Sequence, residues 1–338
     1  MNNLWLFSNQ PDHTVVQDTL EGLRSIPMFK DCRAGKATIK FHGDREPFVE
    51  ILENVRGRKC VVVACTATDA EGSVNDHAMM TLVLLDALRR NGGKIDEIVF
   101  PYFPYARQDR RKGASTDRTA ITAKLFAKMV QTTVPELKNL ATVEPHTVYL
   151  EGFFDCTFDR IKVLKAFVND VRSFFPDADR IVVASPDVGG RDRASAFATE
   201  LGAPRPIAYV DKRRPGPGLS KALQLIGSVQ GADVVIVDDI LDTAGSISEC
   251  VRIIREHGAE RILVIAVHGL NNGPAIERLL ACELTGIMYS NSVTQRPEVE
   301  TLPGSRILHI GGFVAEAIHR LITQGSLRSL GNPDPIAR

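Results

Sequence analysis

The sequence is most informative where it reads Val234-Val235-Ile236-Val237-Asp238-Asp239-Ile240-Leu241-Asp242-Thr243-Ala244-Gly245-Ser246. Four β-branched residues in a row predict a buried strand, and a turn of small residues then opens a helix that ends before Gly258. In open parallel sheets, ligands bind at the carboxyl ends of the strands. The stretch therefore predicts a strand, a turn and a helix of a parallel α/β sheet, with a binding site at the turn.

The turn itself predicts a phosphate site. Successive backbone N–H groups over Thr243–Ser246 would point at a dianion from the N-terminus of the helix. Asp238 and Asp239 would repel a phosphate that they faced, so we expect them to face sugar hydroxyls or a bound Mg²⁺. The alternative is an ordinary solvated turn that follows a buried strand.

Short apolar runs alternate with longer amphipathic stretches along the whole chain. Because the runs are continuously apolar, they favour parallel sheets that helices cover on both faces. The pattern occurs twice, before and after about residue 150, which suits a chain of 338 residues. We expect strands at Thr38–Phe41, Cys60–Cys65, Glu97–Pro101, Leu140–Val143, Ile181–Ala184, Ile207–Val210, Val234–Val237, Ile262–Val267, Gly286–Ser290 and Ile307–Ile310, and helices at Asn75–Asn91, Arg191–Leu201, Ser246–His257 and Phe313–Ile322.

These patterns predict two α/β domains. The first spans 1–155, and residues 311–325, which contain the last apolar helix at Phe313–Ile322, pack back on it. The second spans 156–310. Residues 326–338, rich in Gly, Pro and Arg, form a loose tail.

The composition excludes several classes of protein. Basic and acidic residues number 41 each, so no overall charge favours nucleic acid or an anionic membrane. The six cysteines contain no CxxC pair, which is typical of reduced thiols in a cytoplasmic protein. Residues 1–13 show neither a basic n-region nor an apolar h-region, and no apolar run reaches 18 residues, so we expect neither secretion nor a membrane span.

Further segments, together with 234–246, resemble the ribose-phosphate diphosphokinase (PRPP synthetase) family. The resemblance runs in order from about Leu6 to Leu321. It implies two tandem doubly wound, mainly parallel-sheet domains of the phosphoribosyltransferase-like type. The segments are Glu50–Gly57, Pro101–Arg111, Glu151–Asp155, Ser185–Gly190 and Val210–Pro215.

The resemblance also implies a reaction. Members of the family transfer the β,γ-diphosphoryl group of Mg-ATP to the C1 hydroxyl of ribose 5-phosphate, giving PRPP and AMP. The implied catalytic residues are Lys212 and Arg214 on a flexible loop, and the implied Mg²⁺ ligands are His146 and Asp187. The implied ATP site comprises His42, Asp44, Glu46, Arg107, Gln108 and Asp109, and the ribose 5-phosphate site comprises Asp238, Asp239, Asp242, Thr243, Ala244, Gly245 and Ser246.

Three segments depart from the family pattern. The adenine-binding segment reads Lys40–Glu46, in which the aromatic residue is His42, or Phe41 with a shift of one residue. Lys112–Ala120 is about three residues longer than the usual segment, and so departs from the family where the resemblance implies a regulatory phosphate and ADP site. Asn291–Pro297 differs from the usual stretch without a consequence that the sequence explains.

Two other functions compete with PRPP synthesis. A phosphoribosyltransferase would consume PRPP, but the tandem layout, Arg107-Gln108 and the loop at 212–214 argue against it. A non-catalytic regulatory relative is expected to have disrupted motifs, and here they are intact. The resemblance further implies a homo-oligomer, a dimer or a hexamer-type assembly, with the adenine site shared between subunits.

Overall fold

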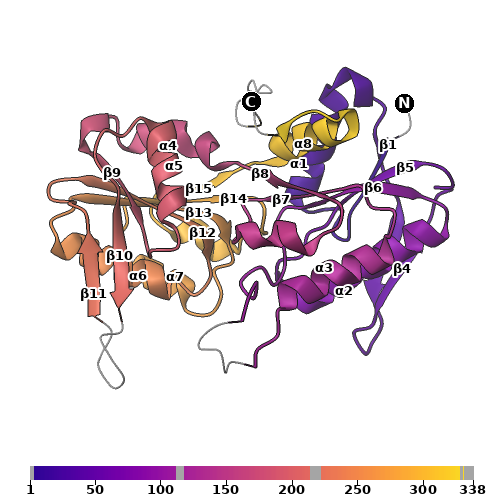
Figure 1. The fold of residues 1–338 in the computed structure, drawn as a ribbon, viewed down its shortest axis with the longest axis horizontal. Coiled ribbons are helices and arrows are strands. Elements are labelled where there is room, and N and C mark those ends of the chain that lie inside the picture. Colours follow the sequence, from indigo (N-terminus) through magenta and orange to yellow (C-terminus); the bar gives the residue numbers. More distant parts are fainter. Residues whose placement is uncertain (1–3, 112–117, 214–221, 328–329, 331–338) are drawn as a thin grey trace. The chain divides into compact units, whose positions relative to one another are not determined.

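The computed structural model describes residues 4–111, 118–213, 222–327 and 330, with only the backbone of 212, 213 and 222. The chain forms two compact units (Figure 1). Unit 1 comprises Met1–Lys162, Asn291–Thr294 and His309–Arg338. Unit 2 comprises Val163–Ser290 and Gln295–Leu308.

The main sheet of unit 1, within the described residues, has six strands in the order β2-β1-β5-β6-β7-β8, all parallel. Its central strands are apolar and buried, as expected for a sheet that helices cover on both faces. A separate antiparallel hairpin is made by β3 and β4. The strands are β1 (Leu4–Phe7), β2 (Arg33–Ala34), β3 (Ala37–Phe41), β4 (Pro47–Ile51), β5 (Lys59–Val63), β6 (Lys94–Phe100), β7 (Asn139–Val143) and β8 (Thr157–Ile161).

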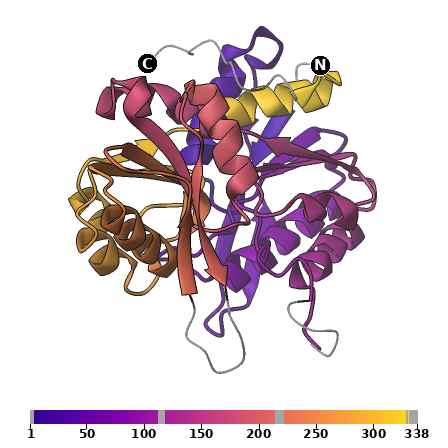
Figure 2. The ribbon, with the colours of Figure 1, turned by 60° about the vertical axis from the view of Figure 1, so that its left-hand side comes forward.

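Two layers of helices cover this sheet. On one face, α2 (Val74–Arg90) and α3 (Thr122–Thr133) bury Leu85 and Phe126 against Ile98 and Phe100 of β6. The remaining long helices of the unit are α1 (Thr14–Ser25) and α8 (Gly311–Thr323), which pack on each other. Figure 2 shows α8, in yellow, beside the indigo α1.

Unit 2 repeats this layered arrangement. Its sheet, over the part that the structure describes, has the order β11-β10-β9-β12-β13-β14-β15, and all pairings are parallel except that of β10 with β11. α6 (Gly245–Glu256) and α7 (Ala275–Leu280) pack on one face of the sheet, and α5 (Arg191–Leu201) contacts β9 and β12. The other elements are α4 (Val168–Phe174), β9 (Ile181–Ser185), β10 (Ala208–Arg213), β11 (Ala222–Ile226), β12 (Asp233–Leu241), β13 (Arg261–Gly269), β14 (Gly286–Ser290) and β15 (Ser305–Leu308).

The predicted fold class, tandem and mainly parallel α/β sheets, is confirmed. The last strand was predicted at Ile307–Ile310 but ends at Leu308, because Ile310 already caps α8. The strand β1 and the helices α1 and α3 were not predicted. Most of the expected tail, 326–338, lies outside the described residues.

Within the described residues, none of the helices is both long and apolar enough to cross a membrane.

The contact of α8 with α1 depends on small residues. A Cβ atom added at Gly311 would lie 2.2 Å from the Cβ of Asp18 and 2.6 Å from the backbone nitrogen of Thr19. A Cβ at Gly22 would likewise lie 2.8 Å from the Cβ of Ala315. Because the atoms around Gly311 include backbone, they cannot yield as a flexible side chain would. The two helices therefore require glycine at this crossing.

We predict that Gly311→Ala lowers the free energy of unfolding by about 2 kcal/mol, the usual effect of overpacking a tight contact. Gly312→Ala is the matched control, since a Cβ there meets no atom within 4 Å and alanine favours a helix. Urea denaturation of the two variants measures the difference. Equal stabilities would contradict the requirement for glycine.

Candidate functional site

The two acidic residues of β12 lie inside the strand. The sequence had suggested that the strand ends at Val237, but β12 continues to Leu241 because its pairing with β13 extends to Leu241 and Gly269. On its other side, β12 pairs with β9 only as far as Ile236. Asp238 and Asp239 therefore lie where β12 still runs beside β13 on one side but no longer pairs with β9 on the other.

Both carboxylates of this stretch contact one arginine. Arg193, in the first turn of α5, places Nη1 3.2 Å from Oδ1 of Asp238 and Nη2 3.2 Å from Oδ1 of Asp239. Burial and the charge of Asp239 raise the pKa of Asp238 well above its usual value, and the Arg193 guanidinium opposes this rise. Arg193 was not predicted from the sequence, where it is separated from Asp238 by 45 positions.

The turn after β12 has the geometry expected of an anion site. Ala244 adopts a left-handed conformation with φ of 58°, and α6 begins at the next residue, Gly245. Since the first N–H groups of a helix have no partner within it, those after Ala244 are available to an anion. The first turn of α6 contains no acidic residue that would compete.

Side chains from the following segment hold this turn in place. Asn272 donates to Oδ1 of Asp242 at 2.9 Å, and Arg278 donates to the carbonyl of Thr243 at 2.8 Å. Arg278, on α7, therefore adds a positive charge beside the turn. The sequence analysis missed it, because nothing in the spacing of 243 and 278 indicates a contact.

Asp187 lies in the turn between β9 and α5. Its Oδ1 accepts from the Gly190 N–H at 3.1 Å, and the Ser185 hydroxyl donates to its carbonyl at 2.8 Å. The side chain is exposed. Asp187 is thus held by the turn, with the rest of its carboxylate open to a ligand.

The two predicted catalytic residues are only partly described. Lys212 lies on β10, where its backbone pairs with that of Leu223 on β11. This is a β-hairpin strand and not the start of a loop, so the sequence interpretation of Lys212 as a loop residue was wrong. Arg214 and the predicted flexible segment after it lie outside the described residues.

In unit 1, the predicted adenine segment forms the tip of the β3–β4 hairpin. The backbone N–H of His42 donates to the Glu46 carbonyl at 2.8 Å, and Asp44 accepts from the Glu46 N–H at 3.1 Å. The His42 ring meets the Phe48 ring edge to face, with 5.5 Å between their centroids. His42, Asp44 and Glu46 are all exposed, so the hairpin brings them together at one surface.

The Arg107-Gln108-Asp109 segment follows β6 in the same unit. Tyr105 has a positive φ of 59°, and the backbone then turns so that the Gln108 N–H donates to the Tyr105 carbonyl. The Gln108 side chain accepts from the Thr122 hydroxyl at 2.6 Å, at the first residue of α3. Arg107 is exposed. Gln108 thus supports α3 as well as being a predicted ATP ligand.

His146 is exposed in the segment after β7. Across the described residues, no cluster of three or more His, Cys, Asp or Glu side chains is arranged to hold a metal ion. Mg²⁺ typically binds proteins through one or two carboxylates and completes its shell with water and substrate phosphates. The exposed Asp187 carboxylate fits that mode of binding.

Comparison with known proteins identifies the family. The N-terminal domain of ribose phosphate pyrophosphokinase matches residues 9–133, and the phosphoribosyl transferase domain matches residues 161–285. Ribose-phosphate pyrophosphokinases of Mesorhizobium japonicum and Agrobacterium fabrum are each 36% identical to the chain, covering 90% and 88% of it and 95% and 92% of their own lengths. The chain belongs to the ribose-phosphate pyrophosphokinase family.

A solved structure supports the same assignment. The crystal structure of phosphoribosylpyrophosphate synthetase from Mycobacterium smegmatis has a TM-score of 0.83 to this chain and 28% identical residues, and the match covers 96% of this chain and 100% of that one. The family resemblance seen in the sequence is therefore confirmed.

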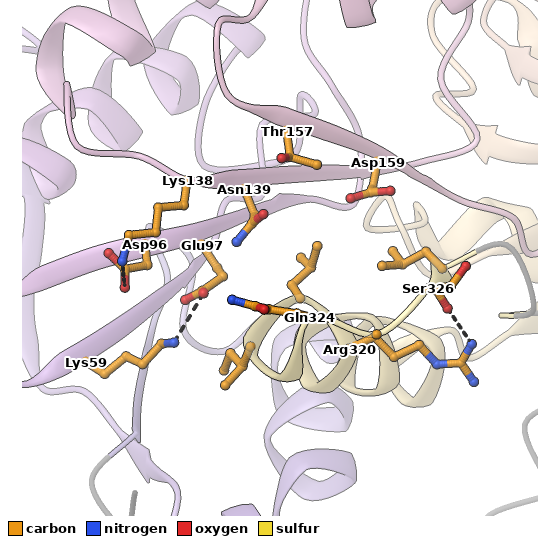
Figure 3. A pocket seen from close by; sticks show the side chains of 14 residues that line it. Lys59, Asp96, Glu97, Lys138, Asn139, Thr157, Asp159, Arg320, Gln324 and Ser326 are labelled. Carbon is orange, nitrogen blue, oxygen red and sulfur yellow. Dashed lines mark hydrogen bonds and ion pairs between the residues drawn. The ribbon is translucent and has the colours of Figure 1, made fainter.

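A cavity of about 610 Å³ in unit 1 has none of the predicted site residues in its lining (Figure 3). It is formed in unit 1 at the amino ends of β5 to β8, beneath the end of α8. Lys59 contacts Glu97 at 3.2 Å, and Lys138 contacts Asp96 at 2.9 Å. Ligands of parallel sheets bind at the carboxyl ends of strands, so this cavity is not the expected position of the reaction.

Glu97 is the most buried carboxylate of that cavity. Its side chain is 2% exposed, and its Oε2 has no hydrogen-bond partner among the described residues. Burial raises the pKa of Glu97, and Lys59 acts in the opposite direction. In the folded protein, Glu97 therefore keeps its proton to a higher pH than it does in the unfolded chain. The free energy of unfolding falls as the pH rises through the folded pKa of Glu97. Below the pKa of the unfolded chain, Glu97 has the least effect on that free energy.

We predict that Glu97→Gln raises the free energy of unfolding at pH 8 by about 1 kcal/mol, because it removes a buried charge with an unpaired oxygen. The gain should vanish as the pH falls towards about 4, near the pKa of an unfolded glutamate. Lys59 is one-third exposed and can be solvated without its partner. Denaturant unfolding across this pH range measures the effect.

Glu136→Gln is the control for that experiment, since Glu136 is exposed and paired with Arg89 on the surface. It should leave the pH dependence of stability unchanged. A Glu97→Gln protein that is less stable at every pH would show that the ion pair with Lys59 outweighs the burial of charge.

Proposed function

We propose that this chain is a catalytically active ribose-phosphate pyrophosphokinase, which transfers the β,γ-diphosphoryl group of Mg-ATP to the C1 hydroxyl of ribose 5-phosphate. The products are PRPP and AMP. The observation that carries the proposal is the turn at the start of α6, where the first backbone N–H groups of the helix follow the end of β12, the strand that carries the two carboxylates. A sugar phosphate matches that pairing, with its anion at the helix and its hydroxyls at the acids.

The ribose 5-phosphate site belongs to unit 2. Thr243, Ala244, Gly245 and Ser246 bind the 5-phosphate through their backbone, and Arg278 supports the turn from α7. Asp238 and Asp239 accept hydrogen bonds from the ribose hydroxyls. Asp242, which Asn272 holds, fixes the start of the turn.

The ATP site draws on residues of unit 1 that lie at turns, and Asp109 is the least exposed of them. Arg107, Gln108 and Asp109 bind the nucleotide, with charge-assisted bonds from Arg107 to phosphate. His42, Asp44 and Glu46 bind the adenine of a neighbouring subunit, so the enzyme is a homo-oligomer, a dimer or a hexamer-type assembly. The exposed tip of the β3–β4 hairpin suits such a contact.

Mg²⁺ enters with the triphosphate as part of the substrate. Asp187 and His146 bind it, and the open carboxylate of Asp187 supports this role. Held there, the cation would supply positive charge to the phosphate oxygens of the transferring group. Lys212 and Arg214 stabilise the oxygens of that group, and exclusion of water favours transfer over hydrolysis.

The two units divide this work. Unit 1, in which the predicted domain of residues 1–155 with 311–325 falls, carries the ATP segment and the subunit contacts, and unit 2, for which the sequence predicted 156–310, carries the ribose 5-phosphate site. We place the enzyme in the cytoplasm. The six cysteines, all free thiols in the structure, support a reducing compartment.

Release of AMP tests this function directly. Purified protein with Mg-ATP should release AMP only when ribose 5-phosphate is present, and no nucleobase should be required. A phosphoribosyltransferase would need PRPP and a base instead, and a regulatory relative would bind ATP without turnover. Absence of AMP in this assay would overturn the proposal.

We predict that Lys212→Ala lowers kcat for AMP release by a factor of about 10² or more, since it removes a charge that acts on the transferring group. The affinity for ribose 5-phosphate should stay within about twofold, because Lys212 is assigned to the other substrate. Lys162→Ala is a control on a lysine outside the assigned site. Turnover near that of the unaltered enzyme would remove Lys212 from the mechanism.

We also predict that Ser246→Asp weakens ribose 5-phosphate binding about tenfold or more, because a carboxylate would then occupy the first turn of α6, where the phosphate binds. The fold should be retained, since an acidic residue stabilises a helix N-terminus. Ser246→Asn, similar in size but neutral, is the matched control. Calorimetric titration with ribose 5-phosphate and thermal unfolding measure the two effects separately.

A further inference from the structure

Arg193 occupies an unusual position for a cation. It lies in the first turn of α5, where the helix dipole favours negative charge, and its side chain is only 18% exposed. Arginine is seldom buried to this extent unless it is paired. Its contacts with Asp238 and Asp239, both at 3.2 Å, compensate for the unfavourable position. The placement of Arg193 is therefore explained by the two carboxylates and not by the helix.

The geometry of the guanidinium suits two carboxylates at once. Its nitrogens Nη1 and Nη2 each contact a different aspartate, so one planar group joins two neighbouring side chains. Adjacent residues of a strand normally point to opposite faces. Here β9 no longer pairs with β12 beyond Ile236, which opens that edge of the strand to a side chain from α5.

The turn before α5 leaves room for this arginine. A Cβ added at Gly190 would lie 3.4 Å from Nη1 of Arg193 and 2.4 Å from the Ser185 hydroxyl. The same turn holds Asp187 through the Gly190 N–H. One short segment thus positions both the proposed metal ligand and the arginine that contacts the proposed sugar ligands.

The charges around Asp238 are unbalanced without Arg193. Asp239 on the same strand and Asp187 in the turn after β9 both act on Asp238 with negative charge, and Arg193 from α5 is the cation that opposes them. With Arg193 removed, the two adjacent acids of β12 would repel each other or share a proton. Either change would disturb the acceptors that the ribose hydroxyls require.

We propose that Arg193 is a positioning residue for ribose 5-phosphate: it fixes the carboxylates of Asp238 and Asp239 side by side, as paired acceptors for the ribose hydroxyls. This inference rests on the proposed ribose site. Arg193 acts through the two aspartates and has no role in the transfer itself. It therefore governs the KM for ribose 5-phosphate, with much less effect on the KM for ATP.

The test compares Arg193→Ala, Arg193→Lys and the control Arg191→Ala by steady-state AMP release with each substrate varied. Arg191 is in the same helical turn, but its guanidinium lies 5.5 Å from the centre of the Tyr209 ring. We expect Arg193→Ala to raise the KM for ribose 5-phosphate about tenfold or more, as for loss of one partner of a buried charge pair. The KM for ATP should change less than about twofold. Arg191→Ala should match the unaltered enzyme.

Two further results separate positioning from a general structural role. Arg193→Lys should restore the KM only in part, because one ammonium cannot hold both carboxylates as the planar fork does. Millimolar guanidinium, far below denaturing concentrations, should lower the raised KM of Arg193→Ala and leave that of Arg191→Ala unchanged. If Arg193→Ala does not fold, Arg193→Lys alone still tests the inference through the split between the two KM values.

The outcomes distinguish this inference from the ribose site on which it rests. Asp238→Asn and Asp239→Asn should also raise the KM for ribose 5-phosphate. If they do and Arg193→Ala does not, the positioning role is wrong and the site stands. If neither aspartate variant changes that KM, the ribose site itself is wrong. If Arg193→Ala raised both KM values and lowered kcat and thermal stability together, Arg193 would be assigned to folding alone.

Discussion

Repulsion between two neighbouring carboxylates is the constraint that the site in unit 2 has to meet. Asp238 and Asp239 follow each other on β12, a strand whose preceding residues are fully buried. Burial makes each charge expensive, and proximity makes the pair more so. The end of β9, the turn at Gly190 and the first turn of α5 together bring one guanidinium to both acids. A binding site for hydroxyl groups can exist there because that charge is present.

The proposed phosphate end of the same site differs in its source of positive charge. No side chain with a full charge faces outward from the first turn of α6, and backbone amides provide the positive potential. Ala244 takes a left-handed conformation to make the turn, which is uncommon for a residue other than glycine. Such local strain is often found where a backbone is shaped for a ligand. The sugar and the phosphate would thus be recognised by acids and by amides, respectively.

The sequence predicted the fold class and the strand, turn and helix at 234–257, because apolar runs and glycine stops report local structure directly. It did not predict how far β12 extends, since the pairing of Leu241 depends on β13, a strand supplied by residues nearly thirty positions later. Arg193 and Arg278 were missed for the same reason. Each makes its decisive contact with a residue far along the chain, and a lone arginine in a helix carries no sign of its partner.

Local patterns also misplaced Lys212, whose strand is completed by pairing with β11. The assignments of His42, Arg107, His146 and the other ATP-side residues stay predictions.

The path of the chain has a consequence for how the protein is made. Unit 1 begins at the N-terminus, yet α8, which packs on α1 through Gly311, is encoded after all of unit 2. A ribosome releases the residues of unit 2 before it releases that helix. The part of unit 1 that is synthesised first therefore lacks the helix that packs on α1 until α8 has been made. Unit 2, which is synthesised in between, can be complete before unit 1. Deletion of α8 would accordingly damage unit 1, although that helix follows unit 2 in the chain.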